Sequence, residues 1–519
     1  MSDDLTDPFF PEDDPTPPDA PVASSPAHAP QALAPGVSGV EASSAPLPRG
    51  LCFDFLLIRD QHDRAAILVD GPGNPYVVLI DSREGANLIR REAKEQGTSL
   101  RSTDVKEIQE ILRDHAAEAA APTWAYCRVA PVENGIEIDL GDDAHRRIRI
   151  TPGEVRILKG GSRVLFYRSP VMRPFVRPAK RADLQRLAKY VNLPPMQQLL
   201  LIAWLSYTLA HPKTPGIIYV VLVLLGAQGT GKSFLCKHVI LALVDPSRIG
   251  VQVFPQNQKD FVVAAKNAHV LAYDNLRYVR QQMSDLLCTA ATGGAVSARQ
   301  LYTDADLHVE ELHVALVLNG LHDFVDQPDL AQRCLPLRLQ PIEEVRRRSE
   351  QDLLDEMGKD MPVIFRGLLD LIADILVHLP TVKPKNPQRM IDFSRWLAAM
   401  EKACDAPPGA IEREYETVLR QFQRDSLQEN ALAEGILSLV DGMTHERWQG
   451  TPEDLLERLC DVVSPIARRS RDWPSNPIAL SKRLRSMEGG LRSQGIGIDF
   501  TRGKRRQITL FKLVGDQYV

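Results

Sequence analysis

The chain has 519 residues, of which 44% are apolar and 25% charged, and its formal net charge is −5. These values are ordinary for a soluble globular protein of roughly three domains, and the acidic balance alone argues against nucleic-acid binding. Seven scattered cysteines, with no CxxC pair or Cys/His cluster, argue against a disulfide framework and a zinc site, so we expect reduced thiols and a cytoplasmic protein.

Two further features of the whole chain bear on its partners. The longest apolar run, Ile217 to Leu225, has nine residues, whereas a membrane helix needs about 18, so we expect no membrane span. The acidic N-terminus lacks the apolar stretch of a signal peptide. Residues 466–512 contain twelve Lys/Arg and three Asp/Glu, which is a local reversal of sign that favours a partner surface at this end.

The first 181 residues divide at about residue 50. Residues 1–50 hold eleven prolines and eight acidic residues among many Ala and Ser, a composition typical of a disordered tail. Residues 51–181 alternate strand-like and helix-like runs with Asn-Gly and Pro-Gly turns, which predict a small α+β domain with an antiparallel meander. Asp139, Asp142 and Asp143 could mark a metal site, but a turn between edge strands explains them equally.

Residues 182–342 carry the pattern of a doubly wound α/β domain. GIIYVVLVLL, ending at Leu225, is a continuous β-rich run without alternation, as expected of a strand buried on both faces of a parallel sheet. HVLAYD and VALVLNG are further buried-strand candidates, and helical patterns separate them. Strands that alternate with helices predict a parallel sheet covered on both faces.

GAQGTGKS, residues 226–233, follows the first of these strands and fits the G-x-x-x-x-G-K-[ST] pattern of a P-loop. Its glycines allow the backbone to surround phosphate oxygens, Lys232 would neutralise the β- and γ-phosphates, and the Ser233 hydroxyl would bind Mg²⁺. We therefore predict nucleotide binding by Gly226, Ala227, Gln228, Gly229, Thr230, Gly231, Lys232, Ser233 and Phe234.

A P-loop site also needs a carboxylate at the end of a neighbouring strand to hold the magnesium ion. Asp274, 42 residues after Lys232, is placed for this role, and its alternative is a polar cap at a strand end. Many P-loop ATPases follow this aspartate with a glutamate that polarises the attacking water, but here Asn275 follows. Asparagine can orient water but cannot accept a proton, so we expect slow hydrolysis or a base from elsewhere.

Three further segments complete the expected catalytic set. Asn319, at the end of the third strand, could contact the γ-phosphate and the attacking water. Arg333, in DLAQR, could reach the γ-phosphate of a neighbouring subunit, or could be a solvated helix residue. TGGAVSARQLY, residues 292–302, predicts a projecting hairpin or an ordinary surface connection that carries Arg299.

The rest of the chain is helical and then basic. Residues 343–435 are helical in pattern. In residues 436–519, Asn476-Pro477 predicts a helix start, and Leu480, Leu484, Met487 and Leu491 form one apolar stripe. The Gly489-Gly490 pair predicts a weakened helix that could end early. Two alternating runs around RGKRR follow, giving the outline of a winged helix.

Cations off the apolar stripe and at the tip between the two runs would contact duplex DNA, with the helix in the major groove and the wing on the backbone. The alternatives are a solubilising charged face or a patch that docks on the acidic remainder of the chain. The DNA-binding candidates are Lys482, Arg483, Arg485, Arg492, Arg502, Lys504, Arg505 and Arg506.

The ordered set GAQGTGKS, LAYDN, TGGAVSARQLY, LVLNG and DLAQR resembles the ATP-binding proteins of phages, plasmids and integrative elements, which are related to superfamily-three helicases and the primase-helicases of satellite phages. GIEIDLGDDAHRRIRITPGEVRIL, VLFYRSPVMRPF, PQRMIDFSRW, WQGTPEDLLERL and DWPSNPIALSKRLRSMEGGLRSQGIGIDF extend the resemblance over about residues 120–515. It implies an AAA+-like P-loop core, ATP and Mg²⁺ as cofactors, and a hexameric or similar ring.

In that family's terms, Lys232, Ser233 and Asp274 would hold ATP and Mg²⁺, and Asn319 would be the sensor. Arg333 would be the arginine finger, and the segment with Arg299 would contact DNA in the ring's channel, although Arg299 could instead be the trans-acting arginine. We see no primase arrangement before the ATPase. The expected function is an ATP-dependent DNA helicase or translocase of a mobile element, acting on single-stranded or forked DNA; the alternatives are a nucleotide-gated DNA-binding assembly switch and a small-molecule kinase.

Overall fold

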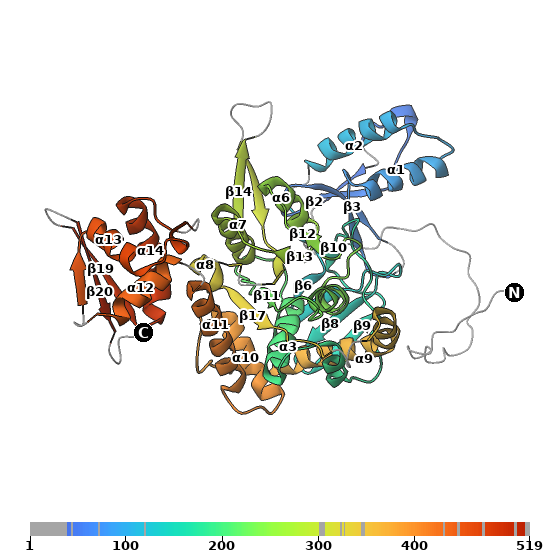
Figure 1. The fold of residues 1–519 in the computed structure, drawn as a ribbon. Helices are drawn as coiled ribbons and strands as arrows, with labels where there is room; N and C mark the ends of the chain where they lie inside the picture. The colour runs from blue at the N-terminus through green and yellow to red at the C-terminus, as the bar shows by residue number, and fades with distance from the viewer. Residues whose placement is uncertain are drawn as a thin grey trace. The chain divides into compact units, whose positions relative to one another are not determined.

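The computed structural model describes residues 39–42, 45–70, 73–118, 121–299, 307–321, 324–325, 327–343, 348–428, 431–443, 447–469, 473–502 and 506–513 (Figure 1). The chain divides into two compact units: residues 1–187 with 351–370 form unit 1, and residues 188–350 with 371–519 form unit 2. Within the described ranges, no helix combines the length and the apolar character that crossing a bilayer requires.

Unit 1 begins with an antiparallel sheet in the order β1-β2-β3-β4, and two amphipathic helices share its core. Ser82 caps the first of these helices, because its hydroxyl accepts a hydrogen bond from the Gly85 N–H at 2.9 Å. The elements are β1 (Gly39–Glu41), β2 (Leu56–Arg59), β3 (Ala65–Val69), β4 (Tyr76–Leu79), α1 (Arg83–Glu95) and α2 (Ser102–Ala116), with a 3-10 turn at Pro48–Gly50.

The folded part of unit 1 begins before residue 51, so the expected tail boundary is wrong. β1 pairs with β2 through Gly39 and Ile58, and Ala42 and Leu47 are buried in the core of the sheet. The acidic residues and prolines of the first 36 residues dominate the composition of residues 1–50. The segment from Val37 to Leu47 has only one charged residue, and the average over fifty residues hides this difference. Residues 1–38 lie outside the described part, so their disorder stays a prediction.

The second sheet of unit 1 is the antiparallel meander that the turn signals predict, in the order β6-β7-β8-β9. Asn134 and Gly153 lie in its two tight turns with positive φ angles of 58° and 75°. The elements are β6 (Val129–Val132), β7 (Gly135–Asp139), β8 (Arg147–Thr151) and β9 (Glu154–Leu158), together with the short parallel pair β5 (Ala125–Tyr126) and β10 (Leu165–Phe166) and the 3-10 helix η3 (Leu184–Tyr190).

Unit 2 contains a five-stranded sheet in the order β12-β13-β16-β11-β17, in which all pairs are parallel. Its strands are β11 (Val221–Leu225), β12 (Gln252–Val253), β13 (Val270–Leu276), β16 (Ala315–Gly320) and β17 (Cys334–Arg338). β11 is shorter than the apolar run that predicted it, but every residue in it is buried. This mixed α/β fold with a parallel sheet agrees with the expected fold class.

Helices surround the sheet of unit 2 (Figure 1). α6 and α7 share an apolar core with β11, β13 and β16. The helices of this part are α3 (Pro195–Ala210), α4 (Lys232–Phe234), the π-helix η4 (Leu235–Ile240), α5 (Leu241–Val244), α6 (Gln258–Lys266), α7 (Gln281–Thr292), α8 (Pro328–Ala331), α9 (Glu350–His378), α10 (Ile391–Ala403) and α11 (Ala410–Gln428). Residues 351–370 of α9 belong to unit 1.

The C-terminal part of unit 2 has its own apolar core, to which Leu480, Leu484, Met487 and Leu491 contribute. Its elements are α12 (Ala431–Asp441), β18 (Arg447–Gly450), α13 (Pro452–Val462), the 3-10 helix η6 (Ala467–Arg469), α14 (Pro477–Ser493), β19 (Ile496–Arg502) and β20 (Arg506–Lys512). The three strands form an antiparallel sheet in the order β18-β20-β19.

The predicted start of α14 is confirmed, because the Asn476 side chain accepts a hydrogen bond from the Ala479 N–H at 2.8 Å and Pro477 is the first helical residue. The early end expected from Gly489-Gly490 is wrong, since α14 continues to Ser493. Two glycines cost a helix about 2 kcal/mol, and burial of Met487 and Leu491 on either side of the pair offsets this cost.

Candidate functional site

The loop GAQGTGKS connects the C-terminal end of β11 to α4, and its glycines have backbone conformations that other residues rarely adopt. The φ angles of Gly226, Gly229 and Gly231 are 150°, 80° and 86°. A Cβ atom at Gly226 would lie 3.0 Å from both the Leu339 carbonyl oxygen and Thr230 Oγ1. Only glycine therefore lets the loop close at this point.

Lys232 places its ammonium group inside the loop. Its Nζ donates to the carbonyl oxygens of Gly226 at 2.7 Å and Ala227 at 2.9 Å, and the residue is only 9% exposed. Burial lowers the pKa of Lys232, and the carboxylate of Asp274 acts in the opposite direction. A cation that is removed from water and contacts neutral carbonyls favours an anion as an additional ligand.

Ser233 and Asp274 come together although 41 residues separate them. The Ser233 hydroxyl donates to Asp274 Oδ2 at 2.7 Å. Ser233 is the second residue of α4, and Asp274 lies near the end of β13, two strands away from β11 in the sheet. A hydroxyl and a carboxylate are oxygen ligands of the kind that Mg²⁺ prefers. The structure therefore places the two proposed metal ligands in direct contact.

Asn275 lies in a β-bulge of β13. The register changes from Tyr273↔Leu318 to Leu276↔Gly320, so Asp274 and Asn275 together oppose Asn319. Asn275 is exposed and has a φ of 60°, and its N–H donates to Asp274 Oδ1 at 2.6 Å. Asparagine tolerates this left-handed conformation better than glutamate does, which gives a backbone reason for the departure from the common Asp-Glu pair.

Asn319 lies on β16, the strand between β13 and β11. It is opposite Leu224 of β11 and beside the bulge of β13. The residue is fully buried, and neither its Oδ1 nor its Nδ2 has a hydrogen-bond partner. An unsatisfied buried amide costs about 1–3 kcal/mol. Such a cost at the edge of the sheet where the glycine loop begins indicates a group whose partner is a ligand.

Arg333 lies at the opposite end of the sheet from the loop. Its carbonyl oxygen accepts from the Val221 N–H at 3.0 Å, where β11 begins, and its Nη1 pairs with Asp329 Oδ2 at 2.5 Å. Four residue steps along β11 separate this point from Leu225, or about 13 Å at ~3.3 Å per residue. Arg333 is therefore not brought to the loop of its own subunit.

The segment after α7 is a β-hairpin, formed by β14 (Gly294–Arg299) and β15 (Leu307–Leu312). Figure 1 shows the two strands extending away from the parallel sheet. Arg299 pairs in register with Leu307 at the distal end of the hairpin. Its side chain and residues 300–306 lie outside the described part. The hairpin is thus one of the two expected structures, and any contact by Arg299 stays a prediction.

The cations predicted to bind DNA divide by position. Lys482, Arg485 and Arg492 are exposed on α14, whereas Arg483 is partly buried. Arg502 and Arg506 pair across the β19–β20 hairpin, and Arg506 is exposed. Lys504, Arg505 and the Arg502 side chain lie outside the described part.

Sequence reasoning missed several residues around the loop. Asn192 donates through Nδ2 to the Thr230 carbonyl at 3.5 Å and to the Gln340 carbonyl, and thereby connects the loop to the segment after β17. Phe234 has its ring 5.2 Å from that of His238, which lies in the π-helix after the loop. Arg338 stands in register with Leu225, at the same edge as the loop. Phe234 was predicted together with the loop, but Asn192, His238 and Arg338 belong to no spaced motif, so no sequence signal marks them.

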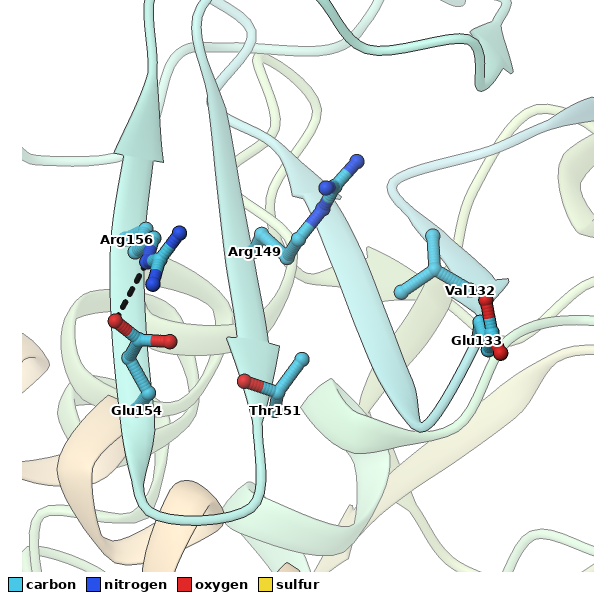
Figure 2. A pocket seen from close by; sticks show the side chains of 6 residues that line it. All are labelled: Val132, Glu133, Arg149, Thr151, Glu154 and Arg156. Carbon is cyan, nitrogen blue, oxygen red and sulfur yellow. Dashed lines mark hydrogen bonds and ion pairs between the residues drawn. The ribbon is translucent and has the colours of Figure 1, made fainter.

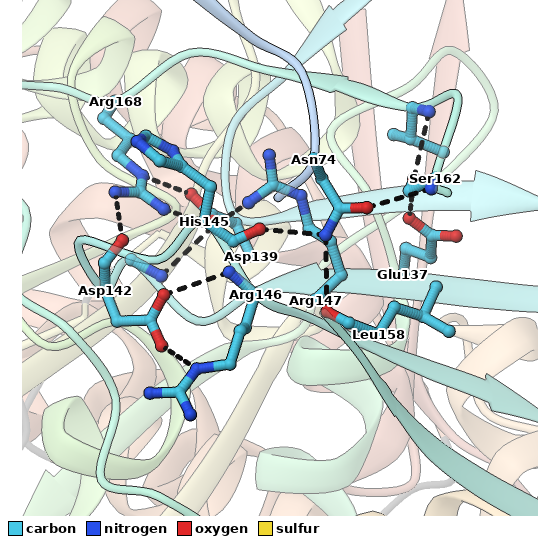
Figure 3. A network of polar contacts seen from close by, with 12 residues as sticks. Asn74, Glu137, Asp139, Asp142, His145, Arg146, Arg147, Leu158, Ser162 and Arg168 are labelled. Atoms are coloured by element: carbon cyan, nitrogen blue, oxygen red, sulfur yellow. Dashed lines mark hydrogen bonds and ion pairs between the residues drawn. The ribbon is translucent and has the colours of Figure 1, made fainter. Parts of the chain in front are cut away.

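Asp139, the last residue of β7, and Asp142 belong to an ion-pair network rather than a metal site (Figure 3). Asp139 is fully buried and accepts from Arg147 and from Arg168, the latter at 2.8 Å, while Asp142 pairs with Arg146 at 2.6 Å. Burial alone would raise the pKa of Asp139, but Arg147 and Arg168 lower it to about 2. β7 and β8 are central strands, so the expected edge position is wrong. No described group of three His, Cys, Asp or Glu residues could hold a metal ion.

A pocket of about 390 Å³ lies on the same meander, lined by Val132, Glu133, Arg149, Thr151, Glu154 and Arg156 (Figure 2). Arg156 pairs with Glu154 at 2.5 Å, and Arg149 pairs with the buried carboxylate of Glu137. The two arginines are thus neutralised, and the pocket offers little charge to a phosphate group.

Two family models match the chain. Residues 183–417 match the actinomycete integrative conjugative element replication protein, and residues 432–514 match the C-terminal domain of this RepA protein. Among curated proteins, none matches the chain.

The solved structures that resemble the chain include an apo form of the NrS-1 C-terminal region. That structure has 12% sequence identity and a TM-score of 0.36, and the match covers 89% of this chain and 97% of that one. The SCCmec type IV Cch protein, described as an active helicase, has 10% identity and a TM-score of 0.44, with 88% and 93% coverage.

The two family models together span more than half of the sequence, and they correspond to the region from the lead-in of the parallel sheet to the C-terminal hairpin. The expected kinship with proteins of mobile elements is thereby confirmed. The chain belongs to the replication proteins of actinomycete integrative conjugative elements.

Proposed function

We propose that this protein is an ATP-dependent DNA helicase or translocase that acts in replication or maintenance of its mobile element. The observation that carries the proposal is the arrangement at the C-terminal edge of the parallel sheet. There the Ser233 hydroxyl contacts Asp274 at 2.7 Å, beside the glycine loop and the unpartnered amide of Asn319. These groups supply what a magnesium-bound triphosphate needs: a cradle, a cation, two metal ligands and a γ-phosphate contact.

The residues present fit ATP and Mg²⁺. The loop glycines and the N-terminal end of α4 and η4 would surround the phosphates, and Lys232 would neutralise them. Ser233 and Asp274 would hold Mg²⁺, whose chemistry is to neutralise charge that develops on the phosphate oxygens. Asn275 would orient the attacking water from its bulge, and Asn319 would contact the γ-phosphate. Ala227, Gln228 and Thr230 supply loop backbone, and Phe234 would contribute to nucleotide binding from α4.

Arg333 supports a ring assembly. Arg333 lies at the opposite end of the sheet and does not reach a nucleotide bound by the loop of its own subunit. This position suits a site that the next subunit completes, as in head-to-tail cyclic oligomers. A guanidinium delivered in this way stabilises transition-state charge. The hairpin β14–β15, with Arg299 at its distal end, would contact DNA in the channel of such a ring.

The C-terminal part has the element order of a winged helix, and we propose that it binds duplex DNA. Helix α12, strand β18, helices α13 and α14, and the β19–β20 hairpin follow one another in that order. α14 would be the recognition helix, and the hairpin with Lys504 and Arg505 at its tip would be the wing. The exposed cations Lys482 and Arg492 lie on α14 outside the buried stripe.

The proposal is tested by measuring ATP hydrolysis and strand displacement on forked DNA with the full-length protein. We expect hydrolysis that DNA stimulates and displacement that requires ATP. Stimulated hydrolysis without displacement would restrict the function to translocation. Absence of hydrolysis under all DNA conditions would overturn the enzymatic proposal.

A second candidate function is a nucleotide-gated DNA-binding switch, and the asparagine at position 275 favours it. This residue cannot act as a proton acceptor, and its left-handed backbone disfavours a carboxylate longer than aspartate. A switch would bind ATP tightly and hydrolyse it negligibly, and DNA would not accelerate the hydrolysis. Equilibrium ATP binding measured beside turnover therefore separates the two functions.

Replacement of Asn319 by leucine should stabilise the protein and inactivate it. Leucine is similar in size and removes both unsatisfied polar atoms, so the nucleotide-free protein should gain about 1–3 kcal/mol. ATP turnover should fall by about a hundredfold, because a contact to the reacting phosphate is lost. Calorimetric melting without nucleotide and steady-state hydrolysis are the two measurements.

The matched control is Asn267→Leu. Asn267 Nδ2 donates to the Val263 carbonyl at 2.9 Å, so its loss should not stabilise the fold, and turnover should stay unchanged. If Asn319→Leu destabilised the nucleotide-free protein as other buried substitutions do, Asn319 would have a structural role and not a ligand-binding one.

Binding to duplex DNA should weaken steeply with salt, and replacement of Lys482 and Arg492 by alanine should reduce that dependence. Each lost phosphate contact lowers the slope of log K against log salt by about 0.9, so the double variant should lose nearly two units of slope. Fluorescence anisotropy of the full-length protein at several salt concentrations measures it. The control removes Arg395 and Arg420 of α10 and α11, which should leave the slope unchanged; equal slopes in all three proteins would place the DNA surface elsewhere.

A further inference from the structure

α14 exposes an apolar side chain within its basic surface. Ile478, the second residue of the helix, is 77% exposed, although the helix buries Leu480 and Leu484 two and six residues further on. An isoleucine contributes nothing to phosphate binding, and its exposure to water is unfavourable by about 1.5–3 kcal/mol relative to burial. A surface that binds only the DNA backbone would not need it.

Ile478 shares its helix face with two cations. Lys482 and Arg485 follow it at four and seven residues, the spacing of one face of an α-helix, and both are exposed. Seven residues advance about 10 Å along the axis, which is roughly the length of three base pairs at 3.4 Å each. One face of α14 therefore presents an apolar group and a guanidinium at a separation that base pairs can match.

Arg485 is oriented by a contact with the β19–β20 hairpin. Its guanidinium carbon lies 4.9 Å from the centroid of the Phe500 ring, and Phe500 is on β19. A cation–π contact of this kind orients the planar fork and reduces the entropy that its immobilisation would cost on binding. A phosphate contact does not need such orientation, but bidentate recognition of a planar base edge does.

We propose that α14 reads DNA sequence in the major groove, with Ile478 against a thymine methyl group and Arg485 on a guanine edge. The inference rests on the proposed binding of duplex DNA by this part of the chain. The thymine C5-methyl is the apolar feature of the major groove, and the guanine O6 and N7 atoms accept a bidentate arginine. The twelve-to-three excess of basic residues between 466 and 512 suits a polyanion as the partner.

The first experiment selects duplexes from a randomised library with the full-length protein without nucleotide. We expect an enriched motif that contains a T·A and a G·C pair about three positions apart. Ile478→Ala should remove the preference at the thymine only, and Arg485→Ala that at the guanine only. Ile391→Ala, which truncates an isoleucine that is 46% exposed on α10, is the matched control and should leave the motif intact.

The second experiment replaces the selected thymine by deoxyuridine, which removes only the methyl group. Wild-type affinity should fall about fourfold, the value of one buried methyl group, whereas Ile478→Ala should bind both duplexes equally. An unchanged wild-type affinity, or an equal loss in the variant, would overturn the assignment of Ile478.

The failures of this inference and of the proposed function are distinguishable. Salt-dependent DNA binding without an enriched motif would overturn sequence reading and leave the proposed DNA binding intact. Loss of self-association in Ile478→Ala, with DNA preference unchanged, would make this face a contact between protein copies instead. Absence of duplex binding by the wild-type protein would overturn both sequence reading and the proposed duplex binding by this part of the chain.

Discussion

Replacement of Lys232 by alanine should reduce ATP hydrolysis by at least about a hundredfold, with or without DNA. The ammonium group is buried within the loop and contacts neutral carbonyl oxygens and the Thr230 hydroxyl. When ATP binds, the ammonium group would contact the phosphates in place of these groups. Loss of one such charge contact in a site that excludes water costs about 3–4 kcal/mol in the transition state. Steady-state hydrolysis by the purified full-length variant is the measurement.

The matched control is Lys237→Ala, which removes an exposed lysine from the π-helix that follows the loop. This control should retain wild-type turnover. Equal turnover in wild type and Lys232→Ala would mean that the measured activity belongs to another site. Loss in both variants, together with lower melting temperatures, would indicate damage to the fold around the loop and not a loss of chemistry.

The sequence predicted the structure at the C-terminal edge of the parallel sheet well, because its signals there are local. A glycine-rich loop after a fully apolar strand specifies strand, turn and helix together, and Ser233 and Asp274 then meet because the C-terminal ends of parallel strands share one edge. The helix cap at Asn476 and the stripe from Leu480 to Leu491 were likewise readable from residue type and spacing.

Other features of the site could not be read in this way, because they depend on how distant segments pair. The bulge that gives Asn275 its left-handed backbone arises from the register of β13 against β16, which no residue of either strand specifies alone. The same holds for Asn192, whose contacts with Thr230 and Gln340 join three separate segments. The position of Arg333 became meaningful only once β17 was placed beside β11.

The N-terminal boundary failed for a different reason. A composition average over fifty residues cannot resolve a short apolar segment at its end, and Ala42, Ala45 and Leu47 are enough to complete the core of the first sheet. Similarly, three aspartates near a turn look like metal ligands until the arginines that neutralise two of them, Arg146 and Arg147 among them, are seen beside them.

Replacement of Arg333 by alanine should reduce ATP hydrolysis by about a thousandfold, the lower end of what an arginine finger contributes. The loss should arise in the neighbouring subunit, since Arg333 lies about 13 Å of strand length from its own loop. A mixture of Arg333→Ala and Lys232→Ala subunits should therefore recover activity. Each inactive subunit supplies the group that the other lacks, and about a quarter of the interfaces in a randomly mixed ring would be complete.

Two defects that belong to the same site cannot rescue each other, and this gives the complementation its control. Lys232 begins the helix that follows β11, and Asn319 lies on the neighbouring strand β16 of the same subunit, so a mixture of Lys232→Ala and Asn319→Leu should stay inactive. Recovery in the first mixture alone requires a site shared between subunits. If instead Arg333→Ala kept its turnover while Arg389→Ala lost it, the finger would be Arg389, which pairs with the same Asp329 carboxylate at 2.8 Å. Both arginines stand at the end of the sheet away from the loop, so the trans geometry would survive that reassignment and only the residue would change.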